Sequence, residues 1–258
     1  MTSSAFDIGP RFDALLRAHG IEPFALATSD AGSLTVPHAT TCVAIRSTNG
    51  VVIAGDRRAT SGNLISHREM DKVMQADAYS GVAIAGAAGT AMEMVKLFQL
   101  QIEHYEKVEG QALSLEGKAN QLSLFVRNNL PAAMQGLMVV PIFAGFEPAT
   151  ASSRIWAYDA TGGRYEEKDF VATGSGMLHA STTTRLGWKS SLTLDGAIDL
   201  ACRSLWQAAE ADSATGGYDP VRGIVPSVAT IDSSGFRFID NGALSSIFST
   251  ISEEVRNA

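Results

Sequence analysis

The residues in this chain that could carry chemistry stand where predicted strands and helices begin or end. Two threonines, Thr40-Thr41, open the first predicted strand, and an aspartate follows the second strand in Gly55-Asp56-Arg57-Arg58-Ala59-Thr60. Lys72 starts the third strand, and two glycine-rich joints follow later, Gly86-Ala87-Ala88-Gly89 and Asp212-Ser213-Ala214-Thr215-Gly216-Gly217. A threonine hydroxyl is a poor nucleophile at neutral pH and needs a base within hydrogen-bond reach. A backbone amide at a glycine-rich bend can donate a hydrogen bond to a developing oxyanion.

Each of these features also has a structural explanation. Paired threonines are ordinary at the start of a strand, an aspartate after a strand suits a turn, and a lone lysine is normally solvated. Glycine-rich joints serve turns and helix caps. Taken singly, these residues favour structural roles, so their significance depends on the elements that bring them together.

The order of predicted elements indicates an α+β fold. Apolar, β-branched runs bounded by turn signals such as Asn49-Gly50 predict strands at 41–45, 51–54, 72–74, 82–85, 139–144, 154–158, 166–172, 224–231 and 236–239. Apolar residues spaced three and four apart predict helices at 91–105, 119–130, 177–186, 194–205 and 243–255. Pro131 should kink or end the second helix. Helix pairs that alternate with antiparallel hairpins predict a four-layer αββα sandwich in one domain.

Composition excludes several classes of protein. The chain has 258 residues with 20 Lys and Arg against 27 Asp and Glu, and this acidic balance argues against nucleic-acid binding. The only cysteines, Cys42 and Cys202, have no histidine nearby in a ligand-like spacing, so we expect neither a disulfide framework nor a structural metal site. No apolar run approaches the ~20 residues that span a bilayer. We therefore expect a soluble, cytoplasmic protein.

The first 39 residues differ from the rest of the chain. They contain no lysine and no sustained strand pattern, and Arg17, His19 and Pro23 interrupt every apolar stretch. A secretory signal needs a basic start and ~7–15 uninterrupted apolar residues, so this segment is not predicted to be one. The open alternatives are an N-terminal tail and a propeptide.

In combination and in this order, the segments resemble the proteasome β-subunits, which are N-terminal-nucleophile (Ntn) hydrolases, and most closely the bacterial, actinobacterial type. The resemblance runs from Thr40 to the C-terminal helix. Its most specific segments are Thr40-Thr41, residues 55–60, residues 97–110 with His104-Tyr105-Glu106-Lys107, Met134-Gln135-Gly136 and residues 212–217.

The resemblance implies a threonine endopeptidase whose nucleophile is Thr40, with Asp56 and Lys72 as its charged partners. A lysine held against the aspartate would put positive charge near the hydroxyl and favour its deprotonated form during attack. The remaining implied site residues are Ser175, Asp212 and Thr215, which would support the terminal amine, and Gly86, whose backbone amide would serve the oxyanion.

The resemblance also implies a zymogen, with 1–39 as a propeptide and 40–258 as the catalytic domain. A free α-amine has a pKa near ~7.7–8.0 and can act as a base, and only a terminal residue carries both that amine and the hydroxyl. Autocatalytic cleavage between Ala39 and Thr40 would therefore create the active enzyme. The family usually has glycine before the nucleophile, so Ala39 is a departure.

Substrate selection is implied to depend on apolar residues beside Thr40, namely Ala59, Met70, Met74, Ile84 and Ala88. That set predicts cleavage after hydrophobic residues. For the two methionines, a role as core fillers is the competing interpretation. No cofactor is implied.

The family resemblance further implies a homo-heptameric ring of β-subunits, with two such rings enclosed between rings of α-subunits. A ring-shaped ATPase would deliver substrates, including proteins tagged with a small ubiquitin-like protein. The alternatives are the two-ring bacterial threonine protease of the same fold, a catalytically silent ring subunit with a structural role, and an amidase that acts on small molecules.

Overall fold

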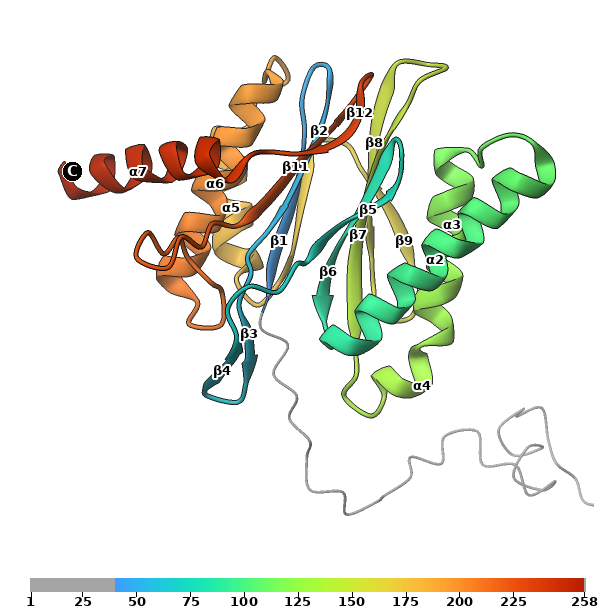
Figure 1. The fold of residues 1–258 in the computed structure, drawn as a ribbon, viewed down its shortest axis with the longest axis horizontal. Coiled ribbons are helices and arrows are strands. Elements are labelled where there is room, and N and C mark those ends of the chain that lie inside the picture. Colours follow the sequence, from blue (N-terminus) through green and yellow to red (C-terminus); the bar gives the residue numbers. More distant parts are fainter. Residues whose placement is uncertain (1–39, 258) are drawn as a thin grey trace, which may run out of the picture. The chain divides into compact units, whose positions relative to one another are not determined.

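The computed structural model describes residues 40–257, whose main strands form two five-stranded antiparallel sheets packed face to face (Figure 1). The first sheet has the order β10-β1-β2-β11-β12 and comprises β1 (Thr41–Arg46), β2 (Gly50–Gly55), β10 (Phe170–Gly174), β11 (Ser227–Asp232) and β12 (Gly235–Phe238). The second has the order β5-β6-β7-β8-β9 and comprises β5 (Val73–Asp77), β6 (Ser80–Gly86), β7 (Val139–Glu147), β8 (Ser152–Tyr158) and β9 (Arg164–Glu167).

Helices cover the outer face of each sheet. The helices beside the first sheet are α5 (Met177–Gly187), α6 (Leu194–Ala211) and α7 (Asn241–Asn257). Those beside the second are α2 (Ala88–Glu109), α3 (Leu115–Asn128) and the short α4 (Leu130–Ala133). Figure 1 shows the two helical layers on opposite sides of the paired sheets. The predicted four-layer αββα sandwich is therefore confirmed.

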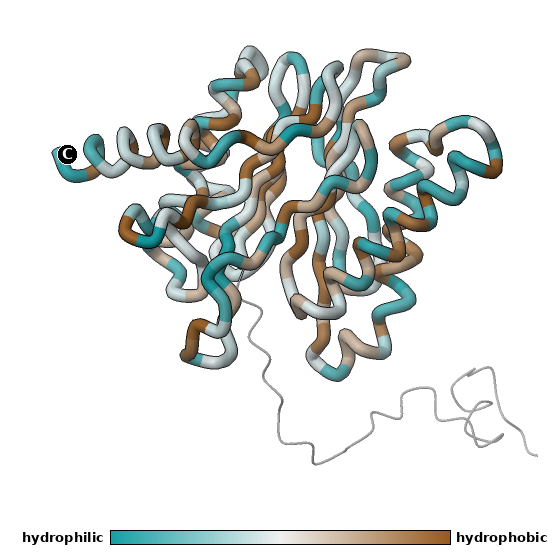
Figure 2. Tube along the Cα trace, viewed as in Figure 1, coloured by the Kyte–Doolittle hydropathy of each residue, from teal (hydrophilic) through white to brown (hydrophobic). Residues whose placement is uncertain are grey.

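Both faces of the central strands are buried, which explains why these strands read as continuous apolar runs rather than as alternating ones. In β1, Val43 and Ile45 pack toward the helices, whereas Cys42 and Ala44 pack toward the other sheet. Successive side chains of a strand point to opposite faces, so both faces need apolar residues here. Figure 2 shows the hydrophobic segments gathered along these central strands.

One predicted strand proves to be two. The stretch expected at 166–172 divides between β9, which pairs with β8, and β10, which pairs with β1 in the other sheet. The chain crosses between sheets at Lys168 and Asp169, where the Asp169 carbonyl accepts a hydrogen bond from the Arg46 amide at 2.8 Å. Residue type alone carried no signal for that change of sheet.

A small hairpin was not predicted at all. It consists of β3 (Ala59–Ser61) and β4 (Leu64–His67), and every residue of β4 is exposed. With no buried face, the hairpin lacks the alternation of apolar residues that announces a strand. It projects from the first residues after β2 and, as described below, forms one wall of a cavity.

The second predicted helix ends shortly before Pro131, as expected. Helix α3 ends at Asn128, and α4 carries Pro131 in its first turn. Proline has no amide hydrogen to donate inside a helix, but that hydrogen is not needed in the first turn.

Candidate active site

Thr40 lies almost fully buried, with 4% of its surface exposed, immediately before β1. Its carbonyl oxygen accepts a hydrogen bond from the Ser175 amide at 2.8 Å. This approach depends on Gly174, which pairs with Thr41 across the sheet and has φ of +98°. A Cβ atom at Gly174 would lie 1.8 Å from the Thr40 carbonyl oxygen, so only glycine allows the two backbones to come this close.

Asp56 and Lys72 form a buried ion pair that joins the two sheets. Asp56 follows β2, Lys72 precedes β5, and Lys72 Nζ lies 2.7 Å from Asp56 Oδ1. The side chains are 0% and 2% exposed respectively. Lys72 also donates to the Arg58 carbonyl at 2.5 Å.

The Asp56 carboxylate is fully supplied with donors. Besides Lys72, it accepts from the amides of Thr41 at 2.8 Å, Arg58 at 2.9 Å and Gly216 at 2.8 Å. A carboxylate offers about four acceptor positions, and all four are used here. Such saturation offsets part of the cost of burying charge and fixes the ammonium group in one place.

A second polar cluster surrounds Asp212, the residue that follows α6. Its Oδ2 atom accepts from the Ser175 hydroxyl at 2.5 Å and from the Thr215 hydroxyl at 2.6 Å. Burial raises the pKa of the Asp212 carboxyl, but these hydrogen bonds and one from the Ala214 amide outweigh it, so the pKa is lowered from its ordinary value. The Thr40 amide in turn points to the Ser175 hydroxyl oxygen at 3.4 Å.

A cavity of about 150 Å³ brings Thr40, Lys72 and Gly86 to one surface. Gly86 has φ of +127°, and a Cβ atom there would lie 2.1 Å from the Met138 carbonyl oxygen, so a side chain cannot be accommodated. Gly86, at the end of β6, therefore lines the cavity with backbone atoms alone.

Four of the five expected substrate-contacting residues line this cavity, namely Ala59, Met70, Ile84 and Ala88. Met74 does not, because it packs against the core between the second sheet and its helices. Its neighbour Val73 faces the other sheet, so the strand turns Met74 toward the helices. The competing interpretation as a core filler thus describes Met74 better.

Several lining residues were missed from the sequence. Thr60, Ser66 and His67 come from the unpredicted β3–β4 hairpin and add a polar wall. An adjoining cavity of about 450 Å³ shares His67, Met70 and Ala88 with the first and extends past Met92. Only a prediction of this hairpin from the sequence could have placed these residues at the cavity.

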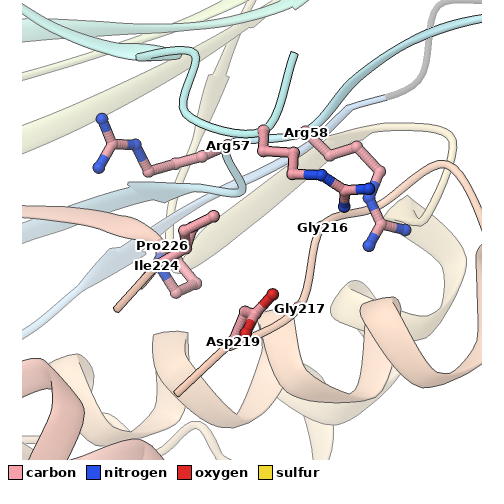
Figure 3. Close-up of a pocket in the computed structure, with 8 residues that line it drawn as sticks. Arg57, Arg58, Gly216, Gly217, Asp219, Ile224 and Pro226 are labelled. Atoms are coloured by element: carbon pink, nitrogen blue, oxygen red, sulfur yellow. The ribbon is translucent and has the colours of Figure 1, made fainter. Parts of the chain in front are cut away.

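A third, much smaller hollow is lined in part by Arg58 and Gly216, whose amides donate to Asp56. Figure 3 shows Arg57, Arg58 and the turn at Gly216 and Gly217 around it. Its volume of about 20 Å³ has room for about one water molecule and none for a peptide side chain.

Cys42 is the other potential nucleophile near these groups, and its environment makes it inert. Its side chain is fully buried, and its thiol donates to the Ile84 carbonyl at 3.5 Å. Burial raises the pKa of the thiol to about 12, with Lys72 lowering it only in part. A thiol with so high a pKa supplies almost no thiolate at neutral pH.

Two expectations concern residues outside the described range, the propeptide at 1–39 and the Ala39 side of the cleavage point. Within residues 40–257, no group of three or more His, Cys, Asp or Glu side chains could hold a metal ion. Nor is any helix in that range long and apolar enough to cross a membrane.

Comparison with known proteins identifies the family of the chain. A family model described as proteasome subunit matches residues 36–221. A relative named proteasome subunit beta from Acidimicrobium ferrooxidans is 53% identical over 252 residues, which cover 97% of this chain and 92% of that protein. Relatives of the same name from Jonesia denitrificans and Streptomyces griseus are 50% and 52% identical, covering 84% and 86% of this chain and 72% and 79% of their own lengths. The chain therefore belongs to the proteasome subunit family, among its β-subunits.

Proposed function

We propose that this chain, a member of a family of threonine peptidases, is itself an active threonine endopeptidase with Thr40 as its N-terminal nucleophile. The observation that carries the proposal is the meeting of Thr40, Lys72 and Gly86 at one cavity, with Lys72 fixed by Asp56. A silent subunit would have no need for a buried ion pair at the wall of an open cavity, since such pairs are weak sources of stability.

The chemistry begins with attack by the Thr40 hydroxyl oxygen on the scissile carbonyl carbon. The hydroxyl proton passes to the Thr40 α-amine, and the positive charge on Lys72 favours the alkoxide character of the attacking oxygen. The Gly86 amide donates to the oxyanion of the tetrahedral intermediate, a contribution commonly worth ~3–4 kcal/mol. The C–N bond then breaks as the amine returns its proton to the leaving nitrogen, and water hydrolyses the remaining ester.

The hydrogen bonds around Ser175 support its role at the amine. Ser175 has one hydroxyl proton, and its shortest contact, 2.5 Å to Asp212 Oδ2, uses it. The oxygen lone pairs therefore face the Thr40 nitrogen as acceptors. Asp212 and Thr215 keep the Ser175 hydroxyl in this orientation. A free amine at Thr40 would then donate to the neutral Ser175 oxygen and would not form an ion pair with the Asp212 carboxylate.

Maturation uses the same groups. In the uncleaved chain, the Thr40 nitrogen is an amide and cannot act as a base, so a water molecule takes that role. The Thr40 hydroxyl attacks the Ala39 carbonyl, the peptide nitrogen leaves as the new α-amine, and water hydrolyses the ester to release 1–39. The methyl group of Ala39 slows this step without preventing it.

Specificity follows from the walls of the cavity. Met70, Ile84 and Ala88 are apolar, and they favour cleavage after hydrophobic residues. Fluorogenic peptides with leucine or phenylalanine before the scissile bond should be hydrolysed faster than matched peptides with glutamate there, and the opposite order would refute this assignment.

The same chain is proposed to assemble in the cytoplasm into seven-membered rings that stack between rings of α-subunits. A ring-shaped ATPase would deliver the substrates, which carry a ubiquitin-like tag. Large apolar side chains left exposed on the single chain support extensive subunit contacts. They include Leu64, Leu100, Met134, Leu178 and Leu186.

The proposed function is tested with Thr40→Ala in chain co-expressed with an α-subunit. N-terminal sequencing of the assembled wild type should begin at Thr40, and the variant should assemble but retain Ala39 and show no peptidase activity. Thr48→Ala, which changes an exposed threonine in the β1–β2 turn, is the matched control and should behave as wild type. Full activity in Thr40→Ala would overturn the proposal.

A further inference from the structure

Thr41, the residue after the proposed nucleophile, has a fully buried side chain whose hydroxyl is held on two sides. The Gly176 amide donates to Thr41 Oγ1 at 3.0 Å. On the other side, Thr41 Oγ1 lies 2.6 Å from the hydroxyl oxygen of Thr215. The side chain of Thr41 lies beside the proposed site but does not line the cavity at Thr40.

The direction of these hydrogen bonds follows from counting protons. The Asp212 carboxylate can only accept, so Thr215 donates its single hydroxyl proton to Asp212 Oδ2 at 2.6 Å. The proton between Thr41 and Thr215 must therefore come from Thr41. The result is a continuous chain of donors that runs from the Gly176 amide through Thr41 and Thr215 to Asp212. Consecutive hydrogen bonds of this kind polarise and strengthen one another.

Thr41 is also bonded to the opposite side of the site. Its amide donates to Asp56 Oδ1 at 2.8 Å, the same oxygen that Lys72 contacts at 2.7 Å. Its carbonyl accepts from the Asp56 amide at 3.1 Å. One residue thus links the carboxylate that binds Lys72 to the carboxylate that binds Ser175.

The packing leaves little freedom for this link to shift. A Cβ atom at Gly176 would lie 2.4 Å from Thr41 Oγ1 and 2.8 Å from Thr215 Oγ1. Glycine is therefore required for the amide of residue 176 to reach the Thr41 hydroxyl. Because Ser175 precedes this amide, the bond to Thr41 also fixes where the Ser175 hydroxyl stands.

We propose that Thr41 is a positioning residue that sets the separation between the Ser175–Asp212 pair, beside the Thr40 nitrogen, and the Asp56–Lys72 pair. This inference rests on the proposed function and deepens it. Thr41 touches neither substrate nor the reacting atoms; it acts through the groups on both sides of Thr40. A displacement of about 1 Å in such groups can cost about a hundredfold in rate.

The test compares Thr41→Val with Thr41→Ser in assembled rings. Valine matches the shape of threonine and keeps the backbone bonds to Asp56, but it leaves the Gly176 amide and one Thr215 lone pair without their partner. We expect Thr41→Val to lower kcat about 10- to 100-fold, with KM within about threefold of wild type and with slower removal of 1–39 by intact mass. Thr41→Ser keeps the hydroxyl and should retain kcat within about threefold.

Thr184→Val is the matched control for losing a buried hydroxyl. Thr184 is 1% exposed and bonds to Ala180 and Ser204 between α5 and α6, away from the cavity. Thr184→Val should have a lower urea unfolding midpoint than wild type but the same kcat. If Thr41→Val rings do not assemble, Thr41→Ala replaces that variant with the same expected loss.

Two results would overturn the role of Thr41. One is kcat within threefold of wild type in the variant that lacks the hydroxyl, and the other is an equal loss in Thr41→Ser. Failure of the proposed function is distinguishable from failure of this inference. It would appear as peptidase activity in Thr40→Ala, whatever the kcat of Thr41→Val.

Discussion

Replacing Lys72 with methionine should separate the catalytic role of its charge from its contribution to stability. Methionine keeps most of the length of the side chain but removes the ammonium group. The Asp56 carboxylate would then retain three amide donors, from Thr41, Arg58 and Gly216, and lose its counter-charge.

Two magnitudes are expected, one for stability and one for the reaction. Removing one partner of a fully buried ion pair costs about 3–5 kcal/mol in the free energy of unfolding, because the remaining charge is left uncompensated. For the reaction, a unit charge at a contact distance of about 4 Å from an alkoxide is generally worth about 4 kcal/mol at an effective dielectric constant near 20. That energy corresponds to about a thousandfold in kcat.

Lys118→Met provides the matched control. Lys118 is another buried lysine whose ammonium pairs with Asp77, but it lies on α3, outside the cavity. The Asp77 side chain is 21% exposed, against 0% for Asp56, so its charge can be partly hydrated and a smaller loss of stability is expected. Activity should remain near that of wild type.

The assay measures kcat on a hydrophobic fluorogenic peptide, propeptide removal by intact mass, and urea unfolding midpoints of the purified chains. Lys72→Met should assemble, remove 1–39 far more slowly and, in its processed fraction, lose about a thousandfold in kcat. A decrease of less than tenfold, or an equal decrease in Lys118→Met, would refute the assignment of Lys72 as the charge that activates Thr40.

Three further outcomes are expected. Burial raises the pKa of the Asp212 carboxyl but hydrogen bonds to it lower the pKa overall, so its stabilising effect is present above the unfolded-state pKa of about 3.9 and is lost as pH falls through the lowered value. Urea midpoints should therefore fall more steeply below about pH 4 in wild type than in Asp212→Asn, and parallel curves would contradict this. Because burial raises the pKa of the Cys42 thiol to about 12, iodoacetamide should leave Cys42 of the native protein unmodified and its peptidase activity unchanged, and should modify Cys42 only after unfolding. Labelling of Cys42 in the native chain would contradict this. Gly174→Ala should prevent processing, since its Cβ would overlap the Thr40 carbonyl oxygen. Gly223 also has a positive φ, but no atom lies within 4 Å of its Cβ position, so the control variant Gly223→Ala should be processed normally. Normal processing of both variants, seen by intact mass, would reject the close-approach argument.

Local pattern was enough to predict most helices and strands. The spacing of apolar residues gave α2 and α6, and Asn49-Gly50 marked the hairpin between β1 and β2. These signals are local because a helix or a hairpin satisfies its backbone within a short stretch of chain. The hairpin of β3 and β4 gave no such signal because it buries no face.

The site residues were nominated from the sequence by family resemblance, and their roles in catalysis stay predictions. What the sequence could not supply was their mutual placement. Met74 was expected beside Thr40, yet the alternation of β5 sends it to the helices. Ser66 and His67 were not expected there, yet the hairpin brings them to the cavity.

The sequence by itself determined most of the helices and strands, the side chains that could act and the positions of the glycine-rich joints. Only the tertiary structure decided that β1 pairs with β10, which sets Gly174 opposite Thr41 and carries Ser175 to the Thr40 nitrogen. It also decided that Thr41 and Thr215, far apart in the chain, share a hydrogen bond. The physical reason is that pairing across sheets and packing between layers join distant segments, and no local periodicity encodes which distant segments will meet.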